Sequence, residues 1–371
     1  MKQLYLALSF CILVLSGFTA SAQNKYNITG TVEDEKGQPL KSATVFLSQS
    51  QSITISDDAG RFGFSQMDQG SYRLIVTMIG YAPYTQDFTL RDKSTDFKVI
   101  LKLKHIELKP VNVGGKDHWN DQYELFRQAF LGTSINGKYC IIKNPTTVYF
   151  STRKDTLIAN ADDFLVIENP RLGYRIKYLL KYFTYNYKSR IALYDGEISF
   201  EPMTGMPKQQ TDWDEHRLDA YQGSFMHWLR SVYHHNTAAE GFVVNPVYRD
   251  YKFFNMQTAE AIRAVDIDYR PVNFDTVAHV VNSSFVALKF NSFFVYYNPK
   301  RAASPRKDTV AVKRSDVIDK TTSLVKLYGK ETLIDSKGAH SDFRDFLLDG
   351  QFGHNRLGDQ LPFEYQPPET H

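Results

Sequence analysis

Apolar and polar positions alternate through residues 26–103, a period typical of short β-strands that place one face in a core. Turn-forming Gly, Asp and Pro residues separate the alternating stretches. This spacing predicts a small antiparallel β-sandwich. The apolar positions that share a face are Tyr26, Ile28 and Val32; Val45 and Leu47; Tyr72, Leu74, Val76 and Met78; and Phe97, Val99, Leu101 and Leu103.

Glycines mark the turns of this region, and we interpret them as turn or bulge positions that need a positive φ. Asp57 and Asp58 form an acidic pair ahead of one such glycine. A calcium site needs about six to eight oxygen ligands, so we predict an Asx-type turn at this pair. The glycines are Gly30, Gly37, Gly60, Gly70 and Gly80.

A helical period appears at residues 119–131, where apolar residues recur at i, i+4, i+7 and i+11. Strand-like runs return at residue 138 and continue to residue 200. A second helix is predicted at residues 213–235, with Thr211 or Asp212 as its N-cap. Gly223 and Ser224 fit a break in that helix, as the C′ residue of one piece and the N-cap of the next.

Further strands are predicted at residues 242–247, 280–288 and 290–297. Residues 298–316 contain two prolines and several Lys and Arg residues, so we interpret them as an exposed loop. A last hairpin is predicted at residues 324–333, around Gly329.

The first 22 residues have the pattern of a secretory signal. Lys2 precedes an apolar run that ends near residue 18, and Ala20, Ser21 and Ala22 fit a cleavage site. The run is shorter than the roughly 20 apolar residues of a membrane span. Cleavage would leave Cys140 as the single cysteine, so no internal disulfide is expected.

Composition narrows the functional classes. The chain has 44 Lys and Arg against 41 Asp and Glu, which argues against a dedicated nucleic-acid binder. Two cysteines exclude a disulfide scaffold and Cys-based zinc folds. Aromatic residues make up 14% of the chain, which favours β-structure.

The predicted fold is therefore mainly β. The predicted order is a signal peptide at residues 1–22, a β-sandwich at 23–104, a linker at 105–118, a β-rich α+β domain with about two helices at 119–300, and a basic loop with a C-terminal extension at 301–371. We expect the extension to pack on the second domain, and no transmembrane span once the signal is removed.

Several short motifs mark the first domain: Ile28-Thr29-Gly30-Thr31-Val32, Gly37-Gln38-Pro39-Leu40, Ala43-Thr44-Val45, Ser56-Asp57-Asp58-Ala59-Gly60-Arg61-Phe62, Gly70-Ser71-Tyr72 and Gly80-Tyr81. With these motifs the sequence resembles the carboxypeptidase regulatory-like domain, whose fold is a seven-stranded, transthyretin-like sandwich. The resemblance implies an accessory module, found beside carboxypeptidases and at the N-terminus of Bacteroidetes TonB-dependent receptors, without catalytic residues of its own.

The remainder carries the motifs Phe130-Leu131-Gly132, Cys140-Ile141-Ile142-Lys143-Asn144-Pro145, Leu172-Gly173-Tyr174, Tyr194-Asp195-Gly196 and Leu361-Pro362. With them it is similar to uncharacterised exported Bacteroidetes proteins, a likeness that implies no known activity. Among its motifs, the second predicted helix carries four polar or aromatic positions. We predict a binding role for these four: Arg217, Tyr221, His227 and Arg230.

No catalytic motif or metal-ligand spacing is recognisable. His216, His227 and His234 are too far apart along a helix to bind one metal, and the H-x-x-E pattern of zinc carboxypeptidases is missing. Cys140 lies in an apolar stretch, so we interpret it as a buried, inert thiol. We therefore predict no catalytic residues, no metal and no cofactor.

We predict a non-enzymatic binding or accessory protein, exported to the periplasm or outer-membrane surface of a Gram-negative, Bacteroidetes-like bacterium. An envelope protein or a surface polysaccharide is the expected partner. Two alternatives stay open. One is a peptidase-like hydrolase with its site in residues 119–371, and the other is an accessory to a TonB-dependent uptake system.

Overall fold

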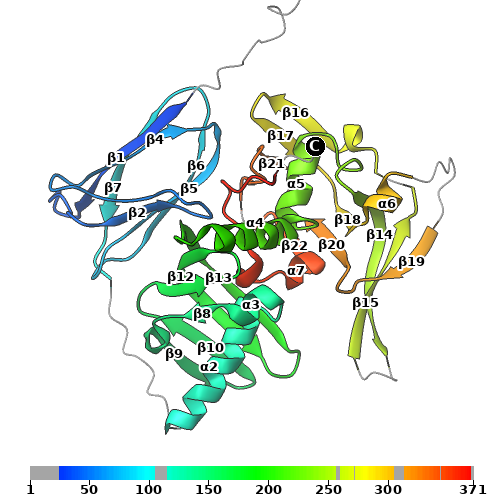
Figure 1. Cartoon of the computed structure of the whole chain (residues 1–371), viewed down its shortest axis with the longest axis horizontal. Coiled ribbons are helices and arrows are strands. Elements are labelled where there is room, and N and C mark those ends of the chain that lie inside the picture. The colour runs from blue at the N-terminus through cyan, green and yellow to red at the C-terminus, as the bar shows by residue number, and fades with distance from the viewer. Residues whose placement is uncertain are drawn as a thin grey trace, which may run out of the picture.

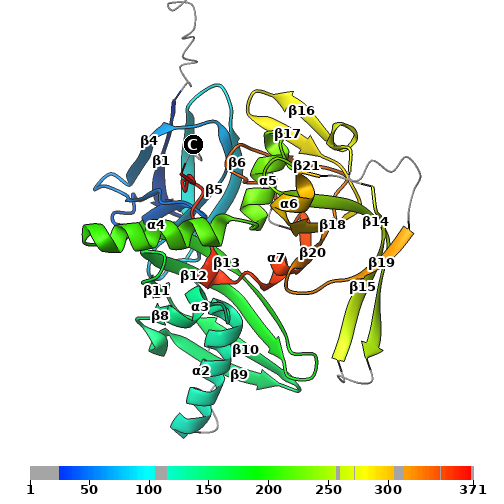
Figure 2. The ribbon, with the colours of Figure 1, turned by 45° about the vertical axis from the view of Figure 1, so that its right-hand side comes forward.

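A computed structural model describes residues 25–104, 115–255, 260–270, 272–304, 313–342 and 344–368. The predicted signal peptide, residues 105–114 of the predicted linker and most of the basic loop lie outside these described residues. Within them the chain is mostly strand, as predicted, and no helix is both long and apolar enough to cross a membrane. Three β-rich bodies surround the helices α4 (Pro207–Tyr221) and α5 (Phe225–Tyr233) and the C-terminal segment, residues 355–368 (Figures 1 and 2).

The first body is the predicted seven-stranded sandwich. Its apolar alternation fills a core between two sheets, in the orders β4-β1-β7 and β3-β2-β5-β6. The expectation of a wholly antiparallel sandwich is wrong at one pair, because β1 and β7 are parallel. The strands are β1 Tyr26–Asp34, β2 Thr44–Leu47, β3 Ile53–Ile55, β4 Arg61–Met67, β5 Gly70–Thr77, β6 Tyr84–Leu90 and β7 Thr95–Leu101.

Turn chemistry in the sandwich is partly as predicted. The Asx-type turn is confirmed, because the backbone N–H groups of Ala59 and Arg61 donate to Asp57 Oδ1 at 2.9 and 2.8 Å. The positive φ expected of Gly30 is wrong. A Cβ on Gly30 would lie 2.5 Å from the carbonyl oxygen of Phe97, so close packing inside a strand explains this glycine.

The second body is a six-stranded sheet in which β12 pairs with β10, β11 and β13. The helix α2 (Gly115–Leu131) buries Phe126 and Phe130 against this sheet and begins four residues before the predicted start. Of the strand expected at residues 139–142, only Ile141–Ile142 forms, because Ser134 caps a short helix just before it, α3 (Ile135–Tyr139). The strands are β8 Ile141–Ile142, β9 Val148–Arg153, β10 Thr156–Ala161, β11 Leu165–Asn169, β12 Tyr174–Asn186 and β13 Ile191–Pro202.

The second predicted helix is two helices, α4 (Pro207–Tyr221) and α5 (Phe225–Tyr233). The predicted break is confirmed, since Gly223 has φ +69° and the Ser224 side chain accepts a hydrogen bond from the His227 N–H. The predicted N-cap at residue 211 or 212 is wrong, because α4 begins at Pro207, whose fixed φ suits a first helical position.

The third body contains a six-stranded sheet in the order β19-β15-β14-β18-β20-β22 and a small sheet in the order β16-β17-β21. The hairpin predicted at residues 324–333 is wrong, because β20 and β21 pair in different sheets. The elements are β14 Phe242–Asn255, β15 Glu260–Asp268, β16 Ala278–Asn282, β17 Phe285–Leu288, β18 Ser292–Tyr297, α6 Pro299–Ala302, β19 Lys313–Val317, β20 Thr322–Leu327, β21 Thr332–Ile334, β22 Phe346–Gly350 and α7 Gln351–His354.

The C-terminal segment, residues 355–368, returns from the third body to the second. Leu357, Leu361 and Tyr365 are buried in the same core cluster as Phe126 of α2. Phe363 N–H also donates to the Gln49 carbonyl of the sandwich at 2.9 Å. The segment therefore contacts all three bodies at the place where they meet.

Candidate functional site

A polar cavity of about 340 Å³ lies where the sandwich meets the second body. Its walls come from three places in the sequence that are far apart. The sandwich contributes β5, β6 and the turn after β2, the second body contributes β13, and the loop before β22 and the C-terminal segment complete it. The lining residues that carry charge or can form hydrogen bonds include Ser48, Arg73, Asp87, Tyr194, Asp195, Glu197, His340 and Ser341.

The outer face of the sandwich sheet is covered by the rest of the chain. Phe46 and Ile75 point away from the sandwich core, yet both are fully buried, and the Phe46 ring lies 5.7 Å from that of Phe164. Gln49 N–H donates to the Ile198 carbonyl, and the Phe200 N–H donates to the Ser50 carbonyl. The turn after β2 thus extends the edge of β13 as a short parallel pairing, which fixes one wall of the cavity.

Arg73 and Asp87 face each other across β5 and β6, where their Cα atoms are paired in register. The Arg73 guanidinium donates two hydrogen bonds to the Asp87 carboxylate, at 2.5 and 2.8 Å. Burial opposes the charged form of Arg73, but the Asp87 hydrogen bonds and the charge of Glu197 outweigh burial and raise its pKa. Arg73 is therefore a fixed positive charge.

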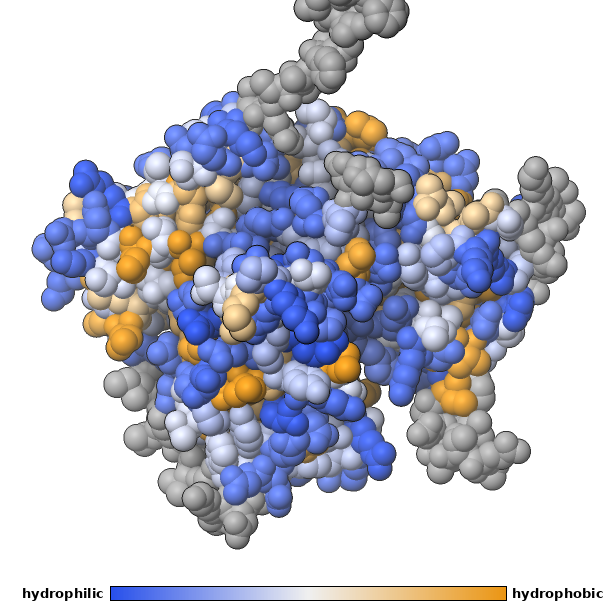
Figure 3. Space-filling view, in the orientation of Figure 1, coloured by the Kyte–Doolittle hydropathy of each residue, from blue (hydrophilic) through white to orange (hydrophobic). Residues whose placement is uncertain are grey.

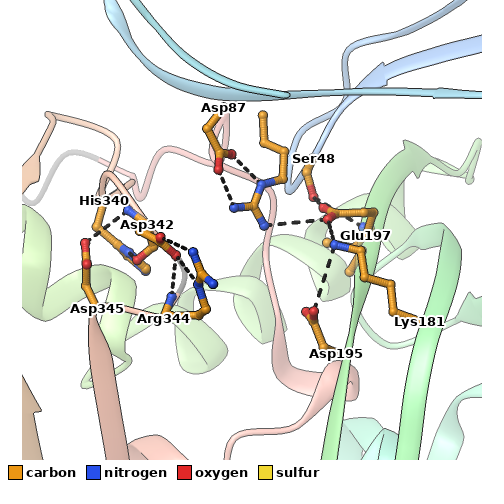
Figure 4. Close-up of polar contacts among 11 residues, drawn as sticks. Ser48, Asp87, Lys181, Asp195, Glu197, His340, Asp342, Arg344 and Asp345 are labelled. Carbon is orange, nitrogen blue, oxygen red and sulfur yellow. Dashed lines mark hydrogen bonds and ion pairs between the residues drawn. The ribbon is translucent and has the colours of Figure 1, made fainter. Parts of the chain in front are cut away.

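Glu197 is the most buried carboxylate of the cavity, with a side chain 1% exposed. It accepts hydrogen bonds from Ser48 Oγ at 2.6 Å and from Lys181, and it lies 3.6 Å from Arg73. Asp195, two residues earlier on β13, lies 3.9 Å from Lys181. Figure 4 shows these β13 and β12 side chains facing the sandwich residues Ser48 and Asp87.

The formal charge of this group is negative. Three carboxylates, Asp87, Asp195 and Glu197, face two cations, Arg73 and Lys181, so the sum is −1. Asp195 has the longest ion-pair distance of the three. The cavity is consequently suited to one additional positive charge beside Asp195.

His340 closes the cavity from the loop between β21 and β22. Its Nδ1 lies 2.8 Å from the Asp342 carbonyl oxygen, which can only accept, so Nδ1 carries the hydrogen. Burial lowers the pKa of His340 and keeps the ring neutral near pH 7. Its Nε2 is then an acceptor, and none of the described residues donates a hydrogen bond to it.

A second polar cluster holds this loop on the sandwich. The buried Asp335 carboxylate accepts hydrogen bonds from the backbone N–H groups of Ser71, Lys337 and Ala339. Lys337 Nζ donates to the Tyr72 hydroxyl at 2.6 Å. A Cβ at Gly70 would lie 2.8 Å from Asp335 Oδ2, so this glycine too serves close approach and not a positive φ, contrary to the expectation.

The four residues predicted to bind lie together, but outside this cavity. Arg217 Nε donates to the Leu172 carbonyl at 2.7 Å. The Tyr221 ring packs on His227 and on Tyr365. His227 Nε2 lies 3.1 Å from Glu240.

Arg230 completes this set. It is 5% exposed and donates to three backbone carbonyls, those of Lys337, Phe363 and Tyr365. Its contacts hold the C-terminal segment in place. A binding role for the four residues stays a prediction.

Sequence reasoning missed the residues of the cavity because each resembles an ordinary strand charge in its own segment. The signal that could have found them is the pair Phe46 and Ile75, which are apolar on the face of the sandwich opposite its core. Cys140 is buried, as predicted, and burial raises the pKa of its thiol to about 12. Among the residues that the structure describes, no group of three or more His, Cys, Asp or Glu could hold a metal ion.

Comparisons with solved structures gave matches over about a quarter of the chain. Similar solved structures include 3-chlorocatechol 1,2-dioxygenase from Rhodococcus opacus 1CP, at 12% identity and a TM-score of 0.19 over 24% of this chain and 62% of that one. They also include the shaft pilin spaA from Lactobacillus rhamnosus GG, at 16% identity and a TM-score of 0.19 over 23% of this chain and 50% of that one. The chain spans less than two thirds of either structure. The comparison with curated proteins gave no match.

One family model does match. Residues 27–103 fit the carboxypeptidase regulatory-like domain, the same stretch in which the sequence motifs lie. The match assigns a carboxypeptidase regulatory-like domain to residues 27–103.

Proposed function

We propose that this chain is a non-enzymatic protein of the cell envelope that binds a small cationic ligand in the cavity between its regulatory-like sandwich and its second body. The observation that carries the proposal is the joint construction of the cavity. Sandwich residues and β13 residues supply its charges together, and Arg73 and Glu197 pair across the boundary. Export and an envelope location rest on the N-terminal sequence pattern.

The arrangement supports binding more than catalysis. The Glu197 and Asp87 carboxylates already accept hydrogen bonds from Lys181 and Arg73. A carboxylate held by a cation is a weak general base, because the cation stabilises its charged form. Asp195 keeps its carboxylate partly exposed to the cavity and is the group we assign to contact the ligand.

The test uses three probes of equal length and different charge: butylamine, butyrate and butanol. Thermal unfolding of residues 23–371 is followed as each probe is added, since a ligand that binds the folded state raises the melting temperature. We expect butylamine to raise it more than the other two. No stabilisation by butylamine, or an equal effect of butyrate, would contradict the proposal.

A pair of variants locates the effect. Asp195→Asn removes the carboxylate that faces the cavity and should weaken butylamine binding about tenfold. Asp58→Asn is the control, because Asp58 lies in an exposed turn, pairs with Lys41 and does not line the cavity. Equal affinities of the two variants would place the amine elsewhere.

A further inference from the structure

A second, mainly apolar cavity of about 270 Å³ lies next to the polar one; nine of its sixteen lining residues are apolar, and the polar ones include Ser224, Asn355 and Asp359. The helices α5 and α7, the strand β22 and the C-terminal segment form its walls. Several of its side chains are only partly buried although protein surrounds them, among them Phe225, Met226, Phe346 and Leu348. A ligand that covers such partly exposed apolar groups removes them from water, which favours binding. The apolar lining residues are Phe200, Ala220, Phe225, Met226, Phe346, Leu348, Phe352, Leu361 and Phe363.

Aromatic rings give this cavity a defined shape. The ring of Phe225 lies 5.2 Å from that of Phe346 and 5.5 Å from that of Phe352, in edge-on and tilted arrangements. His340 packs edge-on against Phe346 at 5.1 Å. Such rings suit an aromatic or short aliphatic group. On the face drawn in Figure 3, hydrophobic residues lie in small separate groups among polar ones, in contrast to this lining.

The two cavities share one wall. Gln49, His340, Gln360 and Phe363 line both of them. In the part of the chain that the structure describes, the side chains of Gln49 and Gln360 form no hydrogen bond, and His340 Nε2 receives none. The wall therefore offers free polar groups and two long, unbranched side chains that can rotate aside.

We propose that the two cavities form one composite site for an amphipathic amine, with the ammonium group beside Asp195 and the apolar tail among Phe225, Phe346 and Phe352. This proposal rests on the proposed function, because it uses the same polar cavity. It adds that the ligand carries an apolar tail, which the second cavity binds. A neutral His340 between the two halves neither repels the ammonium group nor requires a counter-charge.

The proposal predicts that binding affinity rises with the length of the apolar tail. Each methylene group that leaves water for an apolar site strengthens binding about fourfold. Hexylamine has two more methylene groups than butylamine, so it should bind about 15-fold more tightly. An aromatic tail, as in 4-phenylbutylamine, should bind more tightly still.

The experiment is calorimetric titration of residues 23–371 with butylamine, hexylamine, 4-phenylbutylamine and hexanoate. The proposal expects affinity to rise in that order among the amines and hexanoate to bind weakly. Equal affinities of butylamine and hexylamine would overturn the composite site and leave the proposed function standing. Absence of binding by every amine would overturn both. If hexanoate bound as tightly as hexylamine, the proposed preference for an ammonium group would be overturned.

A filling variant tests the place of the tail. Ala220→Met adds a side chain to the apolar cavity and should abolish the advantage of hexylamine while butylamine affinity stays unchanged. Ala303→Met is the control, since Ala303 is exposed and lines neither cavity. An undiminished advantage in Ala220→Met would overturn the assignment. If that variant does not fold, the chain-length series on the unaltered protein decides the matter alone.

Discussion

The Glu197 carboxylate lies at the centre of the contact between the sandwich and the rest of the chain. It is almost fully buried, and each of its partners belongs to a different strand or turn. A buried charge of this kind is tolerated only when opposite charges and donors surround it. At the residue scale, the relative position of the two bodies depends on this group.

Replacing Glu197 by Gln should lower the free energy of unfolding by about 2 to 3 kcal/mol, because Arg73 and Lys181 keep their charges and lose a buried partner. Glu201→Gln is the matched control on the same strand. Glu201 is 30% exposed and, among the residues that the structure describes, forms an ion pair with Lys177 only, so its replacement should cost less than about 1 kcal/mol. Urea denaturation measures both, and similar losses would contradict the role given to Glu197.

Two buried or half-buried histidines make stability depend on pH. Burial lowers the pKa of His227 and His340 in the folded chain below the unfolded value of 6.5. As the pH falls through 6.5, the unfolded chain therefore binds protons that the folded chain does not. The free energy of unfolding consequently falls, by up to about 1.4 kcal/mol per pH unit for each group.

The variant His340→Asn isolates one of these groups. It should flatten the decline of the melting temperature between pH 7.5 and pH 5.5, since the asparagine does not titrate. Identical pH profiles of the variant and the unaltered protein would show that His340 protonates equally in both states.

At the scale of elements, the C-terminal segment joins the bodies. It has little regular structure, and its position depends on side chains of other elements, chiefly on Arg230 of α5, which donates to the Phe363 and Tyr365 carbonyls of the segment. Arg230 carries a charge into a buried place because those carbonyls satisfy its donors.

Arg230→Met should release the segment and lower the free energy of unfolding by about 3 kcal/mol, since several charged hydrogen bonds are lost. Limited proteolysis followed by mass spectrometry should then show early cleavage after residue 354. Arg175→Met is the control, as Arg175 is half-exposed and pairs with Glu168 on the surface. Equal proteolysis of the two variants would contradict the account.

Some of the helices and strands could be predicted from the sequence and others could not. Period-2 alternation predicted the sandwich strands because core contacts are repeated at every second residue. The break at Gly223 and Ser224 was predictable because a positive φ and a cap are local properties. The strands with which β20 and β21 pair could not be predicted, because strand pairing in a sheet depends on contacts between residues that are far apart in the sequence. Gly30 was misread because the atoms that exclude its Cβ belong to β4 and β7.

At the scale of the whole molecule, the regulatory-like sandwich is a wall of the site and not a detached accessory. The candidate site could not be predicted, since Arg73, Glu197 and His340 are more than 120 residues apart in sequence and become neighbours only when the bodies dock. The overall β-class and the sandwich were predicted, because they depend on composition and local periodicity.

The molecule as a whole should lack peptidase activity. The Asp87 and Glu197 carboxylates are held by Arg73 and Lys181, and the Cys140 thiol is buried and protonated. Incubation with a panel of peptides, analysed by mass spectrometry, should show no cleavage. Robust hydrolysis that a chelator abolishes would instead support the hydrolase alternative.

The central claim is that the sandwich and the second body jointly build one binding cavity. The most direct measurement is a crystal structure of residues 23–371 grown with butylamine. We predict density for the amine between β5 and β13, with its nitrogen within about 3.2 Å of an Asp195 carboxylate oxygen. Density for the amine at another place, or an unoccupied cavity at a saturating concentration, would contradict the claim.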